Sequence, residues 1–486
     1  MAKDNIFSDI KKIAEKYPEK SAVKYGLEFI SYAELYKKSA EISSFLKKSG
    51  ISEYDTCLLI AEDSIEYILT ALGIVASDGV FVSAGKNISK KQFNFLLNEI
   101  DIKFIILEDK FIKKLHPDSF SEEISFYTGS KKFTLYRIDP VNKKLKNHEL
   151  NEFKSLNPAF IRFTSGTTSV RKGVVLSHKT IRDRTDAVNK IFKITEKDTV
   201  LWLLPMAYHF AVTIMLFLRH GATIDIAIGI PYSNILKNLI SDSITFTYAT
   251  PFHYSEIIKT TDKSIKIPNK VRMMISTAMP LTKKQSESFF ATFKRYLNQA
   301  YGIIECGLPC INHKPNEKNV LSVGYQIPGA MLSLALQNEK DSFGEIVIKS
   351  PGMFDAYYSP WTPLNEATSH GMFFSGDIGK FNNGCLEIIG RKKSVINFLG
   401  HKIFPEQIET ILTEHPEILD VCVKSEPHDD YGEVIIAEYV PVENSNITST
   451  ELLSFASKHL TDHEIPHHFV EVKYLDRTEN GKLKRY

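Results

Sequence analysis

Small hydroxyl residues gather in a short run that follows an apolar segment. Residues 163–174 read FTSGTTSVRKGV, with five serine and threonine side chains around Gly166 and the cationic Arg171 and Lys172 after them. Hydroxyl groups and backbone N–H groups near a glycine are donors that can surround phosphate oxygens. The chain lacks the GxxxxGK(S/T) pattern, so the run is not a P-loop. Its composition also fits a Ser/Thr-rich surface turn, and the run alone leaves both interpretations open.

Five further segments place charged or polar residues downstream of this run. They read YGIIE at 301–305, GEI at 344–346, SGD at 375–377, GRKKSVINFLGHKIFPEQIE at 390–409 and DRTENGK at 476–482. Each segment alone is weak evidence, because a lone carboxylate or a lysine near the C-terminus is usually a solvated side chain. Their order along the chain makes them informative.

In this order the segments resemble the acyl-adenylate-forming superfamily, which includes acyl-CoA synthetases, the adenylation domains of nonribosomal synthetases and firefly luciferase. The family signatures that they resemble are (Y/F)TSGTTGxPKG, YGxTE, GEL, TGD, GRxxxxIxxxGxxxxPxEIE and PRTxxGK. Residues 29–35, FISYAEL, also resemble the family's early LTYxEL element. The resemblance therefore extends over the whole chain.

The resemblance implies an enzyme, an AMP-forming acid–thiol ligase that works in two steps. A carboxylate attacks the α-phosphate of ATP, pyrophosphate leaves, and a thiol then attacks the acyl-adenylate. The implied cofactors are ATP and Mg²⁺, and the implied acceptor is coenzyme A or the phosphopantetheine of an acyl carrier protein. Two anions must meet in the first step, so the site must chiefly neutralise and align charge.

The resemblance also assigns roles to individual residues. Lys482 would reach the oxygens between the carboxylate and the α-phosphate, and Glu305 would hold Mg²⁺, so the expected catalytic residues are Lys482, Glu305 and Thr164. Asp377 would accept hydrogen bonds from the ribose hydroxyls, with Arg391 assisting. The other expected nucleotide-binding residues are Thr164, Ser165, Gly166, Thr167, Thr168, Lys172, Thr277, Ala278, Met279, Tyr301 and Gly302.

Residues 204–210, LPMAYHF, resemble the family's LPxxH element, with Tyr208 in the histidine position and His209 after it. Family members that activate amino acids have an aspartate in this region, and residues 203–208 contain none. We therefore expect a plain carboxylic acid with an aliphatic, fatty or aryl chain. The expected pocket residues are Tyr208, His209, Phe210, Tyr248, Phe252 and Ala300. His209 fits equally well a buried histidine that backbone groups satisfy.

Departures from the family pattern keep other functions open. Ser169 and Val170 replace the Gly and Pro of the signature, and Ile304 replaces the threonine before the expected metal ligand. One alternative is a non-catalytic relative that binds nucleotide or acyl groups, and another is a stand-alone amino-acid adenylation module. The acceptor also stays open, although the acidic C-terminal part slightly favours coenzyme A over carrier proteins, which are usually acidic themselves.

Alternating strands and helices must position these segments. Apolar runs at 56–61 and 80–82 flank a helical pattern at 65–75. Further strand-like runs lie at 199–204, 244–249 and 271–276. This alternation predicts an α/β fold, with a large N-terminal domain of mixed, largely parallel sheets and flanking helices. Short strands after residue 344 predict a β-rich subdomain.

A change in charge predicts a domain boundary. Residues 391–486 carry a net charge of −6, which leaves +8 on the first 390 residues. The change coincides with the basic run 390–394. We expect a nucleotide- and acid-binding domain over 1–392 and a small, mobile α/β lid domain over 393–486. The resemblance places the hinge at Lys393, about which the lid would turn between the two half-reactions.

Composition excludes several classes of protein. The 486 residues, 43% hydrophobic and 24% charged, are typical of a globular protein with more than one core, and the net charge of +2 gives no reason to expect nucleic acid. Five cysteines without a CxxC pair fit neither a disulfide framework nor a zinc site. The N-terminus lacks a secretory signal, so we expect a cytoplasmic protein. Residues 201–218 are uncharged, but Pro205 and His209 favour a buried strand and core helix over a transmembrane segment.

Overall fold

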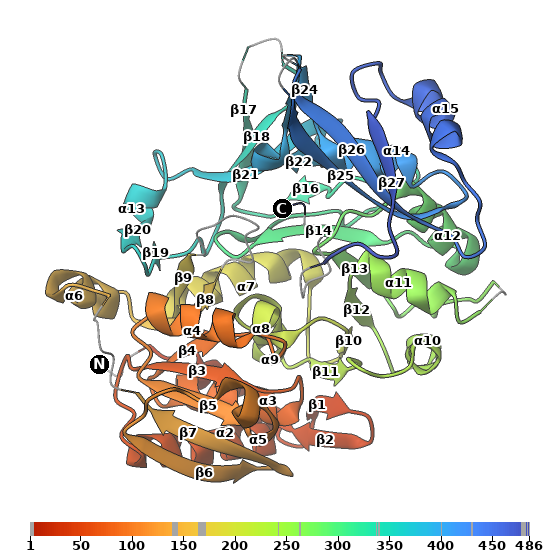
Figure 1. Ribbon diagram of the computed structural model, residues 1–486. Helices are drawn as coiled ribbons and strands as arrows, with labels where there is room; N and C mark the ends of the chain where they lie inside the picture. Colours follow the sequence, from red (N-terminus) through yellow and green to blue (C-terminus); the bar gives the residue numbers. More distant parts are fainter. Residues whose placement is uncertain are drawn as a thin grey trace.

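The computed structural model describes residues 4–138, 144–163, 172–241, 243–261, 264–336, 338, 341–399, 401–428, 431–477, 483 and 485. Most strands in the first part of the chain are short apolar runs, which suits sheets that are covered on both faces. Figure 1 shows these sheets below and behind a smaller C-terminal section, drawn in blue.

The first nine-stranded sheet is parallel in its centre and antiparallel at both edges. Its parallel pairs run in register from Val23 beside Ile224 to Thr277 beside Ala300. In spatial order it contains β16 (Tyr325–Gln326), β15 (Gly307–Ile311), β14 (Asn298–Ile303), β13 (Met273–Thr277), β12 (Phe246–Ala249), β10 (Thr199–Trp202), β11 (Thr223–Ile226), β1 (Ser21–Tyr25) and β2 (Glu28–Ser31).

The second nine-stranded sheet has the same mixed character. Its parallel strands β8, β4, β3 and β5 are joined at both sides by antiparallel pairs. In spatial order it contains β20 (Thr362–Pro363), β19 (Ala356–Tyr357), β9 (Gly173–Ser177), β8 (Pro158–Phe163), β4 (Val80–Ser83), β3 (Thr56–Ile60), β5 (Phe104–Glu108), β7 (Lys131–Arg137) and β6 (Glu122–Thr128).

Helices α2 (Tyr32–Lys48), α3 (Ile65–Ala76) and α7 (His178–Phe192) share one core with strands of both large sheets. Helix α3 is buried on nearly every side, which explains why its sequence is apolar all round. Serine caps start these helices, because the Ser31, Ser64 and Ser177 hydroxyls accept hydrogen bonds from backbone N–H groups of the first turn.

Other helices cover the outer faces of the sheets or connect strands, and some of them also contribute to the shared core. They are α1 (Phe7–Lys16), α4 (Lys90–Glu99), α5 (Asp109–Leu115), α6 (Asn147–Ser155), α8 (Met206–His209), a π-helix (Phe210–Ile214), α9 (Met215–Arg219), α10 (Tyr232–Ile240), α11 (Pro251–Ile258), α12 (Lys283–Phe293) and α13 (Leu364–Ala367).

A third, four-stranded antiparallel sheet is the β-rich part that the sequence predicts after residue 344. Its strands are β17 (Met331–Ala335), β18 (Gly344–Lys349), β21 (Phe373–Asn382) and β22 (Cys385–Arg391). A 3-10 helix, Lys392–Ser394, then leads out of this sheet. The expected hinge residue Lys393 lies in that helix.

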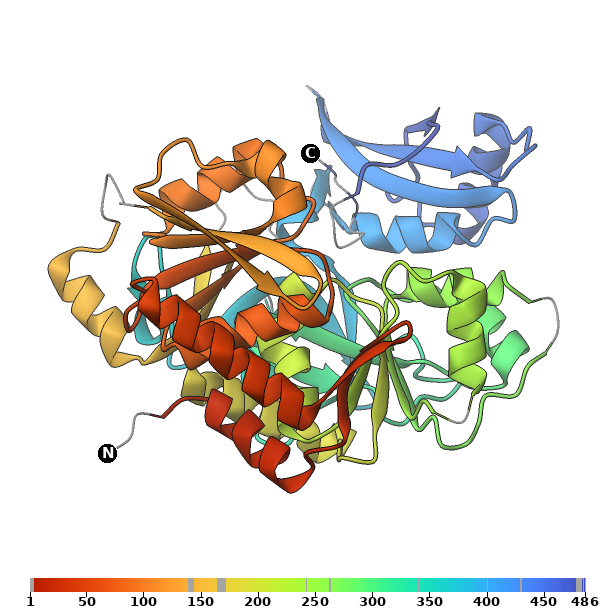
Figure 2. The same ribbon diagram turned by 90° about the horizontal axis from the view of Figure 1, so that it is seen from below.

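The C-terminal section has its own five-stranded sheet and its own core. Its elements are β23 (Ile396–Phe398), β24 (His401–Ile403), α14 (Pro405–Leu412), β25 (Ile418–His428), β26 (Gly432–Pro441), α15 (Ser449–His459) and β27 (His468–Glu471). Figure 2 shows this section stacked on the rest of the chain, not intertwined with it. The predicted fold class is confirmed, whereas the exact boundary at 392 stays a prediction.

The uncharged stretch at 201–218 forms the end of β10 followed by α8, the π-helix and most of α9. Most of its side chains are buried in the cores of the first sheet. Within the part of the chain that is described, no helix combines the length and apolar character needed to cross a membrane.

Gly352 marks the closest approach between α7 and the turn that precedes β19. Its φ is +67°, and a Cβ at this position would lie 2.5 Å from both the Thr180 carbonyl oxygen and the Arg184 nitrogen. Gly384 offers a matched comparison, because its φ is +78° but nothing lies within 4 Å of the added atom. Both glycines have a left-handed backbone conformation in which alanine would be strained. They differ in that an added Cβ would clash with the backbone only at Gly352.

We expect Gly352→Ala to lower stability by about 3 kcal/mol and Gly384→Ala by about 1 kcal/mol, because only the first substitution adds a backbone clash to the strain. Thermal unfolding followed by circular dichroism would compare the midpoints. Equal midpoints for the two variants would show that α7 and the turn can separate without cost.

Candidate active site

Tyr301 and Arg391 hold the carboxylate of Asp377 from two sides. The Tyr301 hydroxyl donates a hydrogen bond to Asp377 Oδ2 at 2.6 Å, and Arg391 Nε lies 2.8 Å from Oδ1. The register of β21 and β22 places Asp377 directly opposite Arg391. Burial, followed by the nearby Asp377 charge, raises the pKa of Tyr301 well above its usual range, so the hydroxyl keeps its proton and acts as a donor. The result is a buried carboxylate of fixed orientation.

Glu305 lies just beyond the end of β14 and meets residues from the second large sheet. The Tyr357 hydroxyl donates to Glu305 Oε1 at 3.3 Å, and the Lys172 ammonium lies 4.3 Å from the centre of the Tyr357 ring. The pairing of Tyr357 with Val174 brings β19 beside β9, where Lys172 precedes the strand. Burial raises the pKa of Glu305, while the charges of Arg162 and Arg391 oppose that rise. The site thus places the Glu305 carboxylate, whose ionised form is disfavoured by burial, among positively charged side chains.

A buried arginine that the sequence analysis did not select supports this arrangement. Arg184, on α7, is 1% exposed and donates from Nε and Nη2 to the Gly352 carbonyl at 2.9 and 2.6 Å. Its Nη1 donates to the Ile304 carbonyl at 3.1 Å, directly before Glu305. An arginine on the buried face of an amphipathic helix was the available signal, but its partners could not be read from the sequence.

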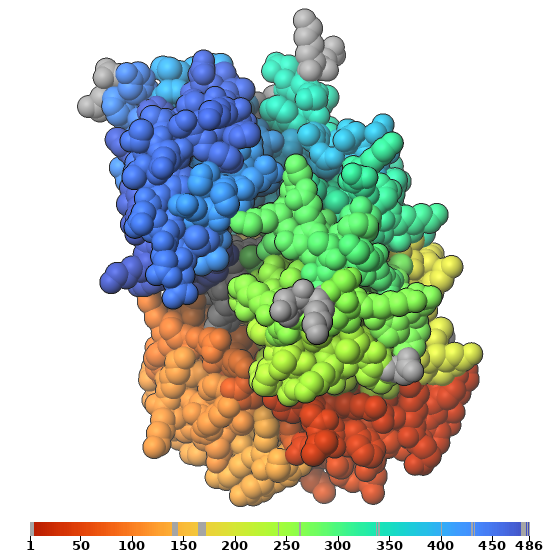
Figure 3. All heavy atoms as spheres, turned by 90° about the vertical axis from the view of Figure 1, so that its right-hand side faces the viewer, coloured from red at the N-terminus to blue at the C-terminus, as the bar shows by residue number. Residues whose placement is uncertain are grey.

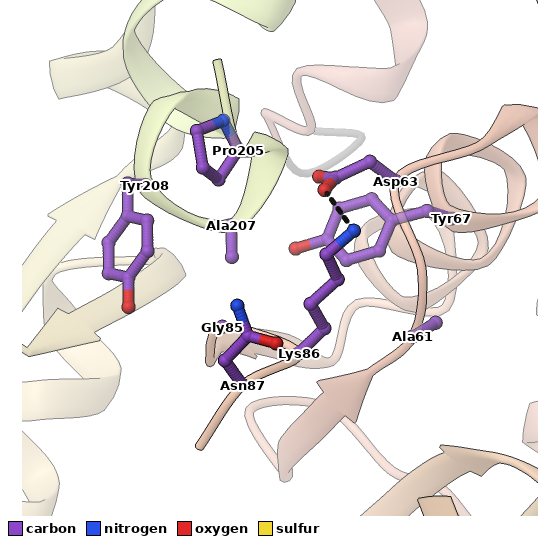
Figure 4. Close-up of a pocket in the computed structure, with 9 residues that line it drawn as sticks. All are labelled: Ala61, Asp63, Tyr67, Gly85, Lys86, Asn87, Pro205, Ala207 and Tyr208. Carbon is purple, nitrogen blue, oxygen red and sulfur yellow. Dashed lines mark ion pairs between the residues drawn. The ribbon is translucent and has the colours of Figure 1, made fainter. Parts of the chain in front are cut away.

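The segment at 205–208 is anchored by a carboxylate from the second large sheet's side. The Met206 N–H donates to Asp63 Oδ1 at 2.6 Å, and Lys86 Nζ lies 3.6 Å from Asp63 Oδ2. Figure 4 shows Asp63 and Lys86 facing Pro205 and Tyr208 across a small cavity. The cavity volume is about 30 Å³, room for little more than water, so it does not accommodate an acid chain.

The expected pocket residues occupy different environments. Phe210, Tyr248 and Ala300 are buried, and Tyr248 stacks on Trp202 with ring centres 5.1 Å apart. Tyr208 and His209 are half-buried at the end of α8, with the His209 ring 6.1 Å from that of Tyr248. Phe252 is 52% exposed at the start of α11. Their roles in binding an acid stay predictions.

Arg162 is a second functional candidate that sequence reasoning missed. It lies on β8, immediately before Phe163 and the hydroxyl-rich run, and its Nη1 donates to the Tyr208 carbonyl. Its guanidinium carbon lies 5.2 Å from the centre of the Tyr208 ring. The signal was an arginine inside the apolar stretch 159–163, AFIRF, which a strand with two covered faces does not normally contain.

The expected adenine-side residues lie at the ends of β13 and β14 and in the turn after β13. Thr277 is buried, and its hydroxyl donates to the Ala300 carbonyl at 2.9 Å, which fixes the ends of β13 and β14 together. Ala278 has a φ of +70°, so the chain turns sharply away from the sheet there. Met279 is half-buried in this turn, and Gly302 is exposed at the end of β14.

Several expected residues lie outside the described part of the chain. They are Thr164, Ser165, Gly166, Thr167, Thr168 and Lys482. Among the described residues, no cluster of three or more histidine, cysteine, aspartate or glutamate side chains is arranged to hold a metal ion.

His209 makes the stability of the protein sensitive to acid. Burial, followed by the Arg162 charge, lowers the pKa of His209 to about 3. In the unfolded chain His209 binds a proton near pH 6.5, whereas in the folded protein it binds one only near pH 3. The free energy of unfolding therefore falls as the pH falls from about 6.5 to about 3.

We expect His209→Asn to reduce the loss of stability between pH 7 and pH 5 by about 1 kcal/mol, because asparagine cannot titrate. Urea unfolding at both pH values would measure the loss. The exposed His148→Asn is the control and should leave it unchanged. The same acid sensitivity in the His209 variant would mean that His209 takes up protons readily in the folded state.

Comparison with known proteins agrees with this geometry. The AMP-binding enzyme family model matches residues 10–358, and the model of the AMP-binding enzyme C-terminal domain matches residues 407–482. The chain is 25% identical to a protein of Humulus lupulus named probable CoA ligase CCL9, over 98% of this chain and 94% of that protein. It is 25% identical to malonate–CoA ligase of Arabidopsis thaliana, over 88% and 76%.

Solved structures share the fold. ATP-bound MatB from Rhodopseudomonas palustris has a TM-score of 0.83 at 20% identity, covering 99% of this chain and 97% of that one. The o-succinylbenzoate CoA synthetase of Bacillus subtilis, in complex with its acyl-adenylate intermediate, also has a TM-score of 0.83, at 19% identity and coverage of 100% and 98%. The chain therefore belongs to the AMP-binding enzyme family, within the acyl-adenylate-forming superfamily that its motifs resemble.

Proposed function

We propose that the protein activates a carboxylic acid with ATP to give an acyl-adenylate and pyrophosphate, and then transfers the acyl group to a thiol. The observation that carries the proposal is the Asp377 carboxylate, held in one orientation by Tyr301 and Arg391. Such a carboxylate is preorganised to accept hydrogen bonds from the two hydroxyls of a ribose. Membership of the AMP-binding enzyme family supports this assignment.

The nucleotide would extend from Asp377 toward Lys172. In this arrangement Thr277, Ala278, Met279, Tyr301 and Gly302 would lie around the base, where β13 and β14 end. Lys172 and the hydroxyl-rich run would receive the β- and γ-phosphates. The proximity of Lys172 and Glu305 through Tyr357 supports a phosphate site there, because cation and carboxylate would face the same charged groups.

Glu305 fits the role of a magnesium ligand. Its burial raises its pKa, so the ionised form gains from a nearby hard cation. Magnesium usually takes one or two protein carboxylates and completes its shell with phosphate oxygens and water, which agrees with a single carboxylate here. When bound, Mg²⁺ would neutralise phosphate charge, while Lys172 and Arg391 add further positive field from the protein.

Lys482 would complete the first step, and the C-terminal section would then rotate at Lys393. Phe404 of the C-terminal section meets Ile378 and Ile389 of the third sheet in a small buried cluster. A cleft of about 400 Å³ separates α12 from the end of α14. Figure 3 shows the blue section bordering the green and orange parts of the surface. A small contact of this kind suits rotation better than an extensive one.

The thiol acceptor that we favour is coenzyme A. The similar proteins are named CoA ligases, and the net charge of −6 on residues 391–486 does not attract an acidic carrier protein. The phosphopantetheine of an acyl carrier protein is the alternative acceptor. Thioester formation with each acceptor, measured side by side, would decide between them.

We expect Lys482→Ala to lower acid-dependent ATP–pyrophosphate exchange by about 100- to 1000-fold, because one cation at the transition state is lost. Thioester formation from a supplied acyl-adenylate should stay near the wild-type rate, since the second step would not use Lys482. The exposed Lys473→Ala is the control and should leave both rates unchanged. Undiminished exchange in the Lys482 variant would refute its role. Absence of exchange with every acid, in a wild-type protein that binds ATP tightly, would favour the non-catalytic alternative.

We expect Tyr301→Phe to lower kcat/KM for ATP about tenfold, because the Asp377 carboxylate loses one fixed donor, a loss of about 1.4 kcal/mol. Steady-state exchange at varied ATP concentration would measure it. The exposed Tyr474→Phe should leave the value unchanged. An unaltered dependence on ATP in the Tyr301 variant would place the ribose elsewhere.

A further inference from the structure

Strand β8 turns Arg162 toward the acid side of the site. Ile161 and Phe163 point into the core that lies under α4 and α6. Successive side chains of a strand alternate between its faces, so Arg162 projects to the opposite face, together with Phe160. On that face it meets Tyr208 at the end of α8.

The contacts of Arg162 leave much of its guanidinium group unused. Nη1 donates to the Tyr208 carbonyl, and the group lies over the Tyr208 ring at 5.2 Å. Nε is buried without a hydrogen-bond partner. Among the described residues, no carboxylate oxygen lies within 4.0 Å of a guanidinium nitrogen of Arg162, the distance that defines an ion pair. Electrostatic interactions with Tyr208 and then with Glu305 partly oppose the effect of burial on the pKa of Arg162.

Arg162 is half-buried and has no close ion pair among the described residues, which is costly for a charge with limited access to water. Burial lowers the pKa of Arg162 to about 10, which still leaves it charged at neutral pH. Unpaired buried donors and charges each cost free energy, and proteins normally supply a partner. His209 cannot help, because it is held neutral beside Arg162. Arg162 therefore has charge and an unpartnered N–H group available for an anion that arrives with a ligand.

The position of Arg162 favours the acid over the nucleotide as the source of this anion. Lys172 and the hydroxyl-rich run would already supply donors for phosphate oxygens under the proposed function. Arg162 is instead tied to Tyr208, in the segment that the family resemblance assigns to acid binding. A planar guanidinium with free N–H groups matches a carboxylate, which it can bind through two parallel hydrogen bonds.

We propose that Arg162 binds a second carboxylate of the substrate, so that the acid activated by this protein is a dicarboxylic acid. This inference rests on the proposed function and narrows its substrate class. The reacting carboxylate would face the α-phosphate, and the other would pair with Arg162 beside Tyr208. The guanidinium would then discriminate against monocarboxylic acids of the same length, which would leave it desolvated and unpaired.

Acid-dependent pyrophosphate exchange with matched acids tests the proposal. Malonate, succinate and glutarate are compared with propionate, butyrate and pentanoate, which have the same numbers of carbon atoms. The wild-type protein should favour at least one dicarboxylate over its partner by about tenfold or more in kcat/KM. Preference for the monocarboxylates throughout would overturn the proposal but leave the proposed function intact. Exchange with no acid of any kind would overturn both.

Variants of Arg162 separate its possible roles. Arg162→Met keeps apolar contact with the Tyr208 ring and should raise KM for the dicarboxylate about 30-fold, while KM for ATP stays within about threefold of wild type. Arg162→Lys keeps the positive charge but loses the planar guanidinium group. Its KM for the dicarboxylate should therefore lie between those of the wild type and of Arg162→Met. If Arg162→Met does not fold, as circular dichroism would show, Arg162→Lys carries the test alone.

A matched control lies at the opposite ends of β13 and β14. Arg295 is also half-buried and donates to a backbone carbonyl, that of Val271. Arg295→Met should leave the preference between acids unchanged. If Arg162→Met weakens exchange equally with all acids and raises KM for ATP instead, the guanidinium binds a phosphate and the proposal is wrong.

Discussion

The buried guanidinium of Arg184 is the interaction on which the candidate site most depends. Three hydrogen bonds from one side chain join α7 to the Gly352 turn and to the backbone just before Glu305. These segments are far apart in the sequence, and the two carbonyls adjoin strands of different sheets, β14 for Ile304 and β19 for Gly352. Because the guanidinium is buried, its N–H groups have no water to replace these partners, so separation of the segments would be costly. The same contact indirectly places Tyr357, since the Phe354 N–H donates to the Glu305 carbonyl at 2.7 Å.

Several positively charged side chains surround the buried Glu305 carboxylate. Arg162 and Arg391 both attract Glu305 electrostatically, and Lys172 lies over Tyr357 nearby. Buried or half-buried cations with few carboxylate partners are unusual, because their desolvation must be offset. Bound ATP and a bound carboxylic acid would bring negative charge that stabilises these desolvated cations. The unfavourable desolvation of the cations in the free protein would thus strengthen the binding of anionic substrates.

The C-terminal section carries a separate ionic centre of its own. Arg485 lies 2.6 Å from Glu409 and 3.3 Å from Glu406, both on α14. Burial raises the pKa of Glu409 to about 7 even though Arg485 opposes the rise. Arg477 pairs with Asp420, and its backbone bridges to Leu483. Arg477, Leu483 and Arg485 are thereby tied to the C-terminal section.

The fold class and the family follow from the amino-acid sequence alone. Apolar runs such as 56–61 and 80–82 are strands because their side chains suit a doubly covered sheet, and the β-rich part after residue 344 follows from its short runs. Asp377 and Tyr301 were each selected from family motifs, whereas their hydrogen bond was seen only in the structure. The fold class and the selection of these positions depend on local pattern or on motif order, which a single sequence contains.

The contacts between distant groups became known from the three-dimensional fold. Arg184 and Arg162 are ordinary arginines in the sequence, and they matter because α7 and β8 direct them toward backbone carbonyls of Ile304, Gly352 and Tyr208. Tyr357 likewise gained its place beside Glu305 from the pairing of β19 with β9. Such contacts arise from packing between segments more than 40 residues apart, and burial then shifts the pKa values of the side chains involved. A local sequence pattern contains no information about which distant groups meet or how far they are desolvated. These residues were therefore recognised only in the folded structure.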